Sequence, residues 1–162
     1  MKKYNYEIIV LKVFLVLAVL SMLFLEIFIF PPAIGLFLES DYQLVSYLIL
    51  LIISIYIISL PYFVALYKAF NLLIMVEKNQ LFSLKAVSAF KLLKICAYSI
   101  SLILLVDLPF LYLIADYDDA PGLLLLGIVI FGISLFISLV ISLLKFIVSS
   151  KVEIETIPAE IV

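Results

Sequence analysis

The order of apolar and polar positions divides this chain into four long hydrophobic stretches separated by short polar connections. The stretches are Ile8–Phe30, Leu44–Ile74, Leu92–Ala115 and Leu123–Val148. Each reaches the ~20 residues that an α-helix needs to cross a hydrocarbon core of ~30 Å. A transmembrane β-barrel would instead show alternating segments of ~10 residues. The pattern therefore predicts an all-α, polytopic membrane protein with four transmembrane helices.

Composition supports a membrane protein. Of the 162 residues, 68% are hydrophobic and 14% are charged, whereas a soluble domain is ~45–50% apolar and ~25% charged. The first stretch is longer than the core of a signal peptide, and Phe30-Pro31-Pro32 offers no small-residue cleavage site, so we expect a retained helix. We expect one four-helix transmembrane domain over residues 1–150, with helices at about 8–30, 44–74, 84–115 and 120–148, and a short cytoplasmic tail over residues 151–162.

The charged residues predict an orientation. All ten lysines fall on one side of the predicted helices: Lys2, Lys3, Lys12, Lys68, Lys78, Lys85, Lys91, Lys94, Lys145 and Lys151. The two other connections, Gly35–Gln43 and Asp116–Pro121, contain acids and no lysine. Short lysine-rich loops stay in the cytoplasm, so both termini and the middle connection are predicted to lie inside. For Lys12, Lys68 and Lys145, which lie near helix ends, we expect side chains that reach the interface along their apolar stems.

Local residue chemistry indicates where the helices begin and end. Pro31-Pro32 should end the first helix, because proline cannot donate to the helical ladder and restricts the residue before it. Ser83 precedes a long apolar-periodic run and is the expected N-cap of the third helix. Asp118-Asp119-Ala120-Pro121-Gly122 is typical of a helix start, since acids favour the positive end of the helix dipole and proline is tolerated in the first turn.

Two acids lie deep in the predicted outer half of the membrane. Glu26 lies about 7 Å below the outer end of the first helix, and Asp107 about 12 Å below that of the third, at 1.5 Å per residue. Charges in a bilayer cost ~2.5–3.5 kcal/mol on insertion scales, and no lysine lies in this half to pair with them. They are protonated, or hydrogen-bonded, or they contact an external cation. The candidate outer acidic site, beneath rim acids that include Glu39 and Asp41, comprises Glu26, Asp107, Asp116, Asp118 and Asp119.

Two further groups of residues are candidates for contacts. The middle connection, Glu77–Lys94, is expected to touch anionic lipid or a cytoplasmic protein through Lys78, Lys85, Lys91 and Lys94. The fourth helix carries small residues along one face, which let helices approach closely; these are Gly127, Ser134, Ser138 and Ser142. Their partner is either another helix of the same chain or a second protomer, so a homo-oligomer stays open.

Several classes of function have no support in the sequence. The chain has no histidine, no arginine and a single cysteine, Cys96. It lacks a paired metal-ligand spacing, a phosphate-binding glycine loop and a nucleophile elbow. We therefore expect no catalytic residues, no cofactor and no metal. The few basic residues belong to a lipid interface, so direct nucleic-acid binding is not expected.

Three segments carry a resemblance to a known family. They are Leu60-Pro61-Tyr62-Phe63-Val64-Ala65-Leu66-Tyr67, then Asn79-Gln80-Leu81-Phe82-Ser83, and Leu108-Pro109-Phe110-Leu111-Tyr112-Leu113 with the following Asp116-Tyr117-Asp118-Asp119-Ala120-Pro121-Gly122. The chain resembles the bacterial four-helix membrane proteins known as domain of unknown function 2975, particularly the members from Firmicutes, over about residues 10 to 150. The C-terminal acidic segment that closes with a Leu-Thr-hydrophobic pattern in many members is not matched, although Thr156 is present.

The resemblance implies a multi-pass protein of the bacterial plasma membrane. Because members are commonly encoded beside a small helix-turn-helix regulator, it also implies such a regulator as a partner. The first hypothesis is accordingly a non-enzymatic sensor or regulatory membrane component that acts with a cytoplasmic partner. The second is an immunity protein against a cationic antimicrobial peptide, with the outer acids as its binding surface. The third is a small ion or solute transporter or channel subunit, with Glu26 and Asp107 lining the path.

Overall fold

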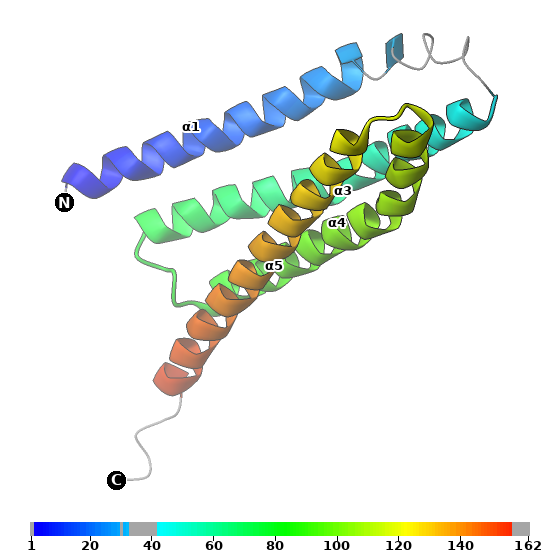
Figure 1. Ribbon diagram of the computed structural model, residues 1–162. Helices are drawn as coiled ribbons and strands as arrows, with labels where there is room; N and C mark the ends of the chain where they lie inside the picture. Colours follow the sequence, from blue (N-terminus) through cyan, green and yellow to red (C-terminus); the bar gives the residue numbers. More distant parts are fainter. Residues whose placement is uncertain (1, 30, 33–41, 157–162) are drawn as a thin grey trace.

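The computed structural model describes residues 2–29, 31–32 and 42–156, and within them the fold is built from long helices (Figure 1). The first, α1, runs over Lys2–Phe24 and continues as a π-helical segment, η1, over Leu25–Ile29. The others are α3 (Tyr42–Glu77), α4 (Leu84–Tyr117) and α5 (Pro121–Thr156). The described residues contain no strand. The all-helical fold class predicted from the sequence is confirmed.

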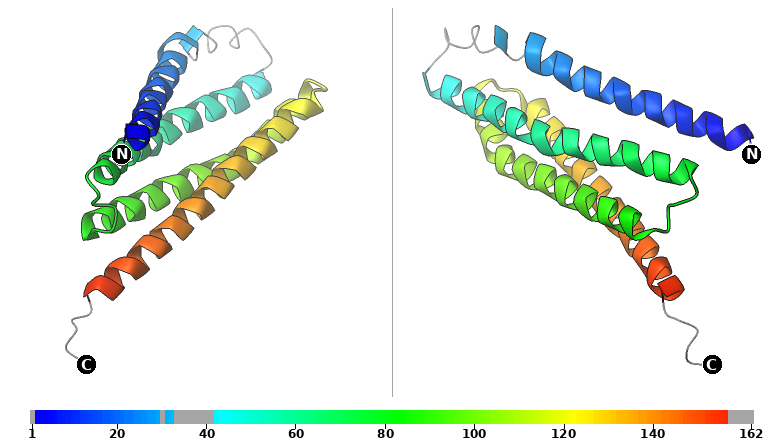
Figure 2. Two further views of the ribbon diagram at one scale, coloured as in Figure 1. Left: turned by 90° about the vertical axis from the view of Figure 1, so that its left-hand side faces the viewer. Right: turned by 180° about the vertical axis from the view of Figure 1, so that it is seen from behind.

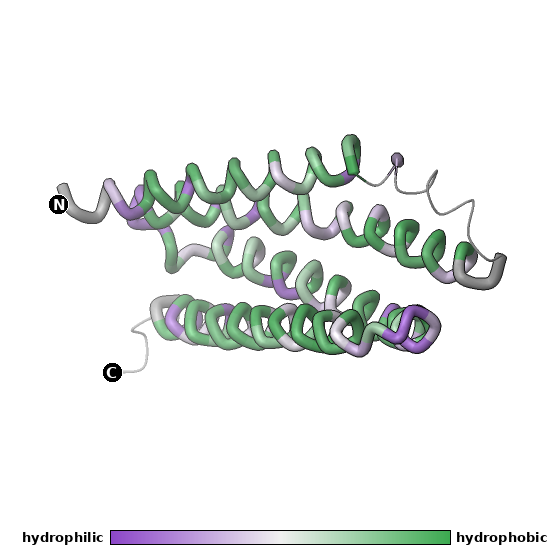
Figure 3. Tube along the Cα trace, turned by 45° about the horizontal axis from the view of Figure 1, so that its top comes forward, coloured by the Kyte–Doolittle hydropathy of each residue, from purple (hydrophilic) through white to green (hydrophobic). Residues whose placement is uncertain are grey.

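Four helices in the described residues are long and apolar enough to cross a membrane. Their candidate spans are Tyr6–Ile29, Val45–Glu77, Leu84–Tyr117 and Pro121–Ile154. Hydrophobic positions run along nearly the full length of each helix, whereas hydrophilic positions gather towards the ends (Figure 3). Large apolar side chains are exposed on every helix, as in Leu60 on α3 and Phe136 on α5. These surfaces are suited to lipid, so the prediction of a four-helix membrane protein is confirmed.

The helices pack in an unequal way (Figures 1 and 2). Contact is most extensive between α4 and α5, slightly less so between α3 and α4, and much smaller between α1 and α3. The helix α1 therefore lies beside the other three, against α3. We call the end where α3 stops and α4 starts the lysine-rich end, and the opposite end the acid-rich end. Which of the two faces the cytoplasm stays a prediction from the lysines.

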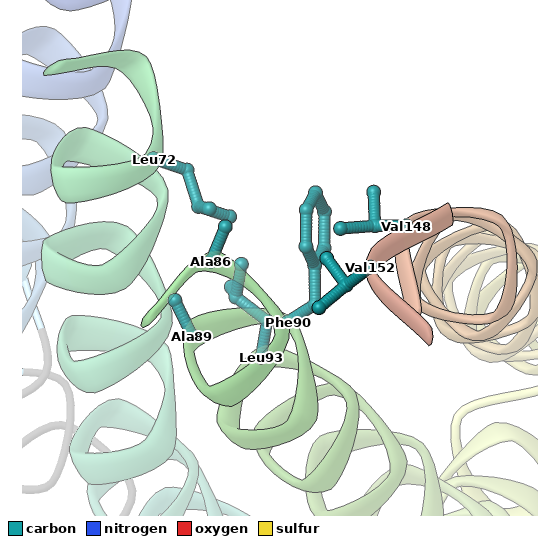
Figure 4. Close-up of a cluster of buried hydrophobic side chains, with 7 residues drawn as sticks. All are labelled: Leu72, Ala86, Ala89, Phe90, Leu93, Val148 and Val152. Atoms are coloured by element: carbon teal, nitrogen blue, oxygen red, sulfur yellow. The ribbon is translucent and has the colours of Figure 1, made fainter. Parts of the chain in front are cut away.

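A cluster of buried hydrophobic side chains lies at the lysine-rich end, between α3, α4 and α5 (Figure 4). Its seven members are Leu72 from α3, Ala86, Ala89, Phe90 and Leu93 from α4, and Val148 and Val152 from α5. The small Ala86, which is fully buried, lets the backbones approach, and the Phe90 ring fills the space towards α5. The ends of three helices are thereby held together beneath the α3–α4 turn.

The α3–α4 turn is set by local chemistry. At the end of α3, Asn79 adopts a left-handed conformation (φ 55°), and the Gln80 N–H donates to the Met75 carbonyl (2.8 Å). This is a Schellman arrangement, with asparagine at the position that glycine usually occupies. The helix α4 begins at Leu84, and the Ser83 hydroxyl accepts from the Ala86 N–H (3.3 Å). The predicted N-cap at Ser83 is confirmed.

The observed helices extend further than the sequence predicted. The first begins at Lys2 and not near residue 8, and α3 continues to Glu77, three residues past its expected end. The last helix runs through the expected tail segment as far as Thr156. The segments gained at the start of α1 and the end of α5 are largely polar, so the apolar pattern that sets the membrane span does not mark where a helix stops once it has left the lipid. Pro61 and Pro109 lie inside α3 and α4.

Candidate functional site

The α4–α5 turn holds three of the predicted outer acids. Asp118 is the C-cap of α4, and Asp119 has φ 50°. The Ala120 N–H donates to the Ala115 carbonyl (2.9 Å), which makes this turn a second Schellman arrangement. The sequence assigned Asp118 and Asp119 to the start of the last helix, but their backbones close the helix before it. The helix α5 itself begins at Pro121, as expected.

The exposed acids of this turn lie together. Asp116 and Asp119 both line a hollow of about 170 Å³ with Tyr112 and Pro121. Asp116, Asp118 and Asp119 are all exposed. Glu39 and Asp41, the other predicted rim acids, lie outside the described residues. The described part of the acid-rich end thus presents a solvated, negatively charged turn.

Asp107 is a buried acid at the contact between α3 and α4. Only 5% of its surface is exposed, and Ser54 of α3 lies within hydrogen-bonding reach of the carboxyl. Its Oδ1 atom has no hydrogen-bond partner among the described residues. A buried polar atom of this kind costs free energy unless it is satisfied, so Asp107 is the least satisfied side chain of the three-helix unit formed by α3, α4 and α5.

Glu26 lies in the π-helical segment and is bound through its backbone. The Tyr56 hydroxyl of α3 donates to the Glu26 carbonyl oxygen (2.9 Å), and the Tyr62 hydroxyl donates to the Ala18 carbonyl of α1 (3.4 Å). A π-helical turn disturbs the regular ladder of an α-helix, and here the disturbed segment receives a hydrogen bond from a neighbouring helix. The side-chain Oε1 of Glu26 is buried without a partner in the described residues. The sequence carries no recognisable signal for this π-helix.

Glu26 and Asp107 are not brought into one site. Glu26 contacts α3 through Tyr56, whereas Asp107 lies by Ser54 of the same helix. Ser54 and Tyr56 are two residues apart, so their side chains point about 200° apart around the helix. The two contacts therefore use opposite sides of α3. The described residues contain no group of three or more histidine, cysteine or acidic side chains that could hold a metal ion. The five predicted outer acids therefore occupy three separate places.

The predicted contact lysines surround the α3–α4 turn and the first turns of α4. Lys78, Lys85 and Lys91 are exposed, and Lys94 is half-buried, with its Nζ 5.6 Å from the centre of the Tyr98 ring. Lys151 of α5, which was not among the predicted contacts, lies 4.7 Å from the centre of the Phe82 ring. This cation–π contact joins the end of α5 to the turn.

One lysine has a partner that the sequence did not predict. The Lys12 Nζ of α1 lies 2.7 Å from Oε2 of Glu77, the last residue of α3. The sequence predicted only that the Lys12 side chain reaches towards the membrane interface. Its partner Glu77 lies 65 residues further along the chain, so nothing local in the sequence indicates the pair. Both side chains are partly exposed, and pairs of this kind contribute little stability, ~0–1 kcal/mol. The contact nevertheless places α1 directly beside the start of the α3–α4 turn.

The small residues of α5 contact α4 of the same chain. A Cβ atom at Gly127 would lie 2.6 Å from Leu111 Cδ1, so glycine permits the close approach of the two helices. The Ser134 hydroxyl is 2.9 Å from that of Ser101 on α4. Ser138 is fully buried and donates to the Leu135 carbonyl (2.7 Å), while Ser142 is half-buried. The stripe thus forms part of the largest interhelical contact.

Comparisons with known proteins identify a family and a related protein. The sequence profile of the family described as "Protein of unknown function (DUF2975)" matches residues 4–156. The chain is 34% identical over 146 residues to "Uncharacterized membrane protein YoaS" of Bacillus subtilis (strain 168), covering 90% of this chain and 91% of that protein. No solved structure matches the chain.

Proposed function

Since the chain belongs to the DUF2975 family, and its relative in Bacillus subtilis is a membrane protein of nearly the same length, we propose that it is a non-enzymatic regulatory component of the bacterial plasma membrane that acts through a cytoplasmic protein. The observation that carries the proposal is the α3–α4 turn, which is a fixed surface of basic and apolar side chains. A small regulator of the helix-turn-helix class is the expected partner, from the family resemblance described above.

The turn is held more firmly than a simple link between two membrane helices requires. The Asn79 cap ends α3, the Ser83 cap starts α4, and the Lys151 side chain covers the Phe82 ring. Leu81 packs against the buried cluster beneath. A turn that served only to set the orientation of the protein would need positive charge but no packed structure, since charge alone biases insertion. The additional contacts favour a surface with one defined shape.

Apolar groups are exposed where the helix has left the lipid. The helix α4 has 34 residues, so it is about 51 Å long, whereas a whole bilayer with its headgroups measures ~40–45 Å. Leu84, its first residue, is 72% exposed, and the neighbouring Phe82 is 41% exposed. Lys78 and Lys85 flank them and are exposed as well. Apolar anchors within a basic rim are suited to a protein surface that is acidic around an apolar pocket.

The contact between α1 and this turn offers a route for a signal. The helix α1 reaches from the π-helical segment at the acid-rich end to Lys12, which is paired with Glu77 beside the turn. Its packing against α3 is small, so a displacement of α1 disturbs few contacts. A ligand or membrane change that moves the outer part of α1 would act on the turn through this pair.

Co-purification from native membranes in mild detergent tests the proposal. Wild-type protein should retain a cytoplasmic partner, and the Lys78→Gln/Lys85→Gln variant and the Leu84→Ser variant should each retain several-fold less. Lys68→Gln is the matched control, since Lys68 lies inside α3 and its Nζ is near the Tyr67 ring and not at the turn. If wild-type protein retains no cytoplasmic protein, or if the turn variants retain it as well as the control does, the proposed function is wrong.

A further inference from the structure

A groove of about 420 Å³ at the lysine-rich end collects three lysines around an apolar floor. Its residues on α4 follow one face of the helix over about three turns, and α5 contributes a single lysine. They are Lys91, Lys94, Ile95, Tyr98, Ser99 and Leu102 of α4, and Lys145 of α5. We propose that this groove binds one anionic phospholipid, with the phosphate held among Lys91, Lys94 and Lys145 and an acyl chain lying along Ile95 and Leu102. The proposal is independent of the cytoplasmic partner proposed above.

The lysines lie at the depth of phospholipid phosphates. Lys94 is 23 residues from the end of α4 at Tyr117, and Lys145 is 24 residues from the start of α5 at Pro121. At 1.5 Å per residue these distances are about 35 Å and 36 Å. Two amines on different helices are therefore level with each other, just beyond a hydrocarbon core of ~30 Å. Basic pockets between transmembrane helices at this depth are suited to anionic headgroups.

Among the described residues, none of the three amines has a carboxylate partner. The described residues place no carboxylate within ion-pair distance of Lys91, Lys94 or Lys145. Within the described part of the chain, the Lys94 amine approaches the Tyr98 ring, a contact that leaves the charge intact. Three positive charges around one groove at the membrane interface require anions, and a phosphate diester supplies both the charge and several acceptor oxygens.

The groove changes from basic to apolar along its length, which favours a lipid over a soluble anion. Leu102 lies 11 residues after Lys91, or about 16 Å further along α4. Ile95 and Leu102 are 54% and 64% exposed on a helix that spans the membrane. A free phosphate would occupy the lysine end alone. An acyl chain would cover the apolar part as well, so an amphipathic occupant accounts for the whole groove.

The chain contains no tryptophan, so a single introduced tryptophan reports on one place. Full-length Tyr98→Trp protein is reconstituted in zwitterionic phospholipid vesicles with a small fraction of brominated lipid, which quenches tryptophan on contact. Brominated phosphatidylglycerol should quench the Tyr98→Trp variant several-fold more strongly than the same fraction of brominated phosphatidylcholine. Leu143→Trp is the matched control, because Leu143 is 64% exposed and points about 200° away from Lys145 around α5. There the two lipids should quench equally.

Substitutions of the groove lysines test whether the groove causes the preference for anionic lipid. In the Tyr98→Trp background, Lys94→Gln with Lys145→Gln should remove most of a binding preference that is about thirtyfold for two lysines, and the two corresponding Arg substitutions should retain it. Equal quenching by both lipids at position 98, or the same preference at position 143, overturns the proposal. So does a preference that survives the Gln substitutions or is lost in the Arg variant. Abolition of the preference by millimolar glycerol phosphate would identify a soluble anion as the occupant and would likewise overturn it.

Discussion

Replacing Gly127 by valine should weaken the contact between α4 and α5, whereas the same change at Gly132 should not. A Cβ atom at position 127 would lie 2.6 Å from Leu111 Cδ1 and 3.4 Å from Leu108 Cδ2, but at Gly132 it would meet nothing within 4 Å. Carbon atoms pack best at ~3.5–4.0 Å, so the Leu111 methyl must move by about 1 Å even for alanine. Both glycines are interior residues of α5, which makes them a matched pair.

The magnitude follows from two opposing terms. Glycine inside a helix costs roughly 0.5–1 kcal/mol relative to alanine, so Gly132→Ala should stabilise the protein by about that amount. At position 127 this gain is offset, because the Leu111 side chain must change its rotamer. Valine places two more methyl groups in the same contact, and overpacking typically costs about 1–3 kcal/mol. We therefore expect Gly127→Val to be less stable than Gly132→Val by about 1–3 kcal/mol.

Unfolding in mixed micelles with increasing SDS, followed by far-UV circular dichroism, measures the difference. The paired design cancels the helix propensity of valine, which is common to both sites. A second variant tests the mechanism: Leu111→Ala removes the obstructing methyl groups, so it should cost less in the Gly127→Val background than in wild type. Equal stability of the two valine variants would refute the close approach of α4 and α5 at this position.

Three further predictions concern topology, a polar contact and a turn. An impermeant thiol reagent should label Asp118→Cys in whole cells and leave Gln80→Cys unlabelled, in a Cys96→Ala background; the reverse result would invert the orientation predicted from the lysines. A double-mutant cycle in SDS titrations should give Ser101 and Ser134 a coupling of about 0.6 kcal/mol, and no coupling would show that their hydrogen bond does not contribute to stability. Asn79→Ala should destabilise the protein by roughly 1–2 kcal/mol and Asn79→Gly should not, because residue 79 is left-handed; equal thermal stability in detergent would contradict this.

Features set by neighbouring residues could be predicted from the sequence. The N-cap at Ser83 depends on the three residues that follow it, and the proline in the first turn of α5 depends on its own ring. The apolar runs reveal the four membrane spans, because lipid acts on each helix separately. The helix ends were less predictable. Once a helix leaves the lipid, polar residues such as those before Thr156 continue it without an apolar signal.

Features that depend on how helices pack could not be predicted. Nothing near Lys12 indicates that its partner is Glu77, because the pair forms only once α1 lies against α3. The two deep acids both lie in the predicted outer half of the membrane, yet α3 separates Glu26 from Asp107, and depth alone does not say on which side of a neighbouring helix a residue falls. The sequence predicted only that the Lys145 side chain reaches the membrane interface. That Lys145 and Lys94 line the same groove is seen only once α4 and α5 are packed together.

The small contact of α1 has a consequence for the order in which the protein assembles. This helix is synthesised before the α3 surface that holds it, which includes Tyr56 and Tyr62. The helices α4 and α5, which follow, form the most extensive contact among the described helices. From α1 to α5, each successive pair of neighbouring helices therefore forms a more extensive contact than the pair before it. During insertion α1 can contact its neighbours only once α3 has entered the bilayer, so we expect it to be the helix that the rest of the protein holds least firmly at this stage.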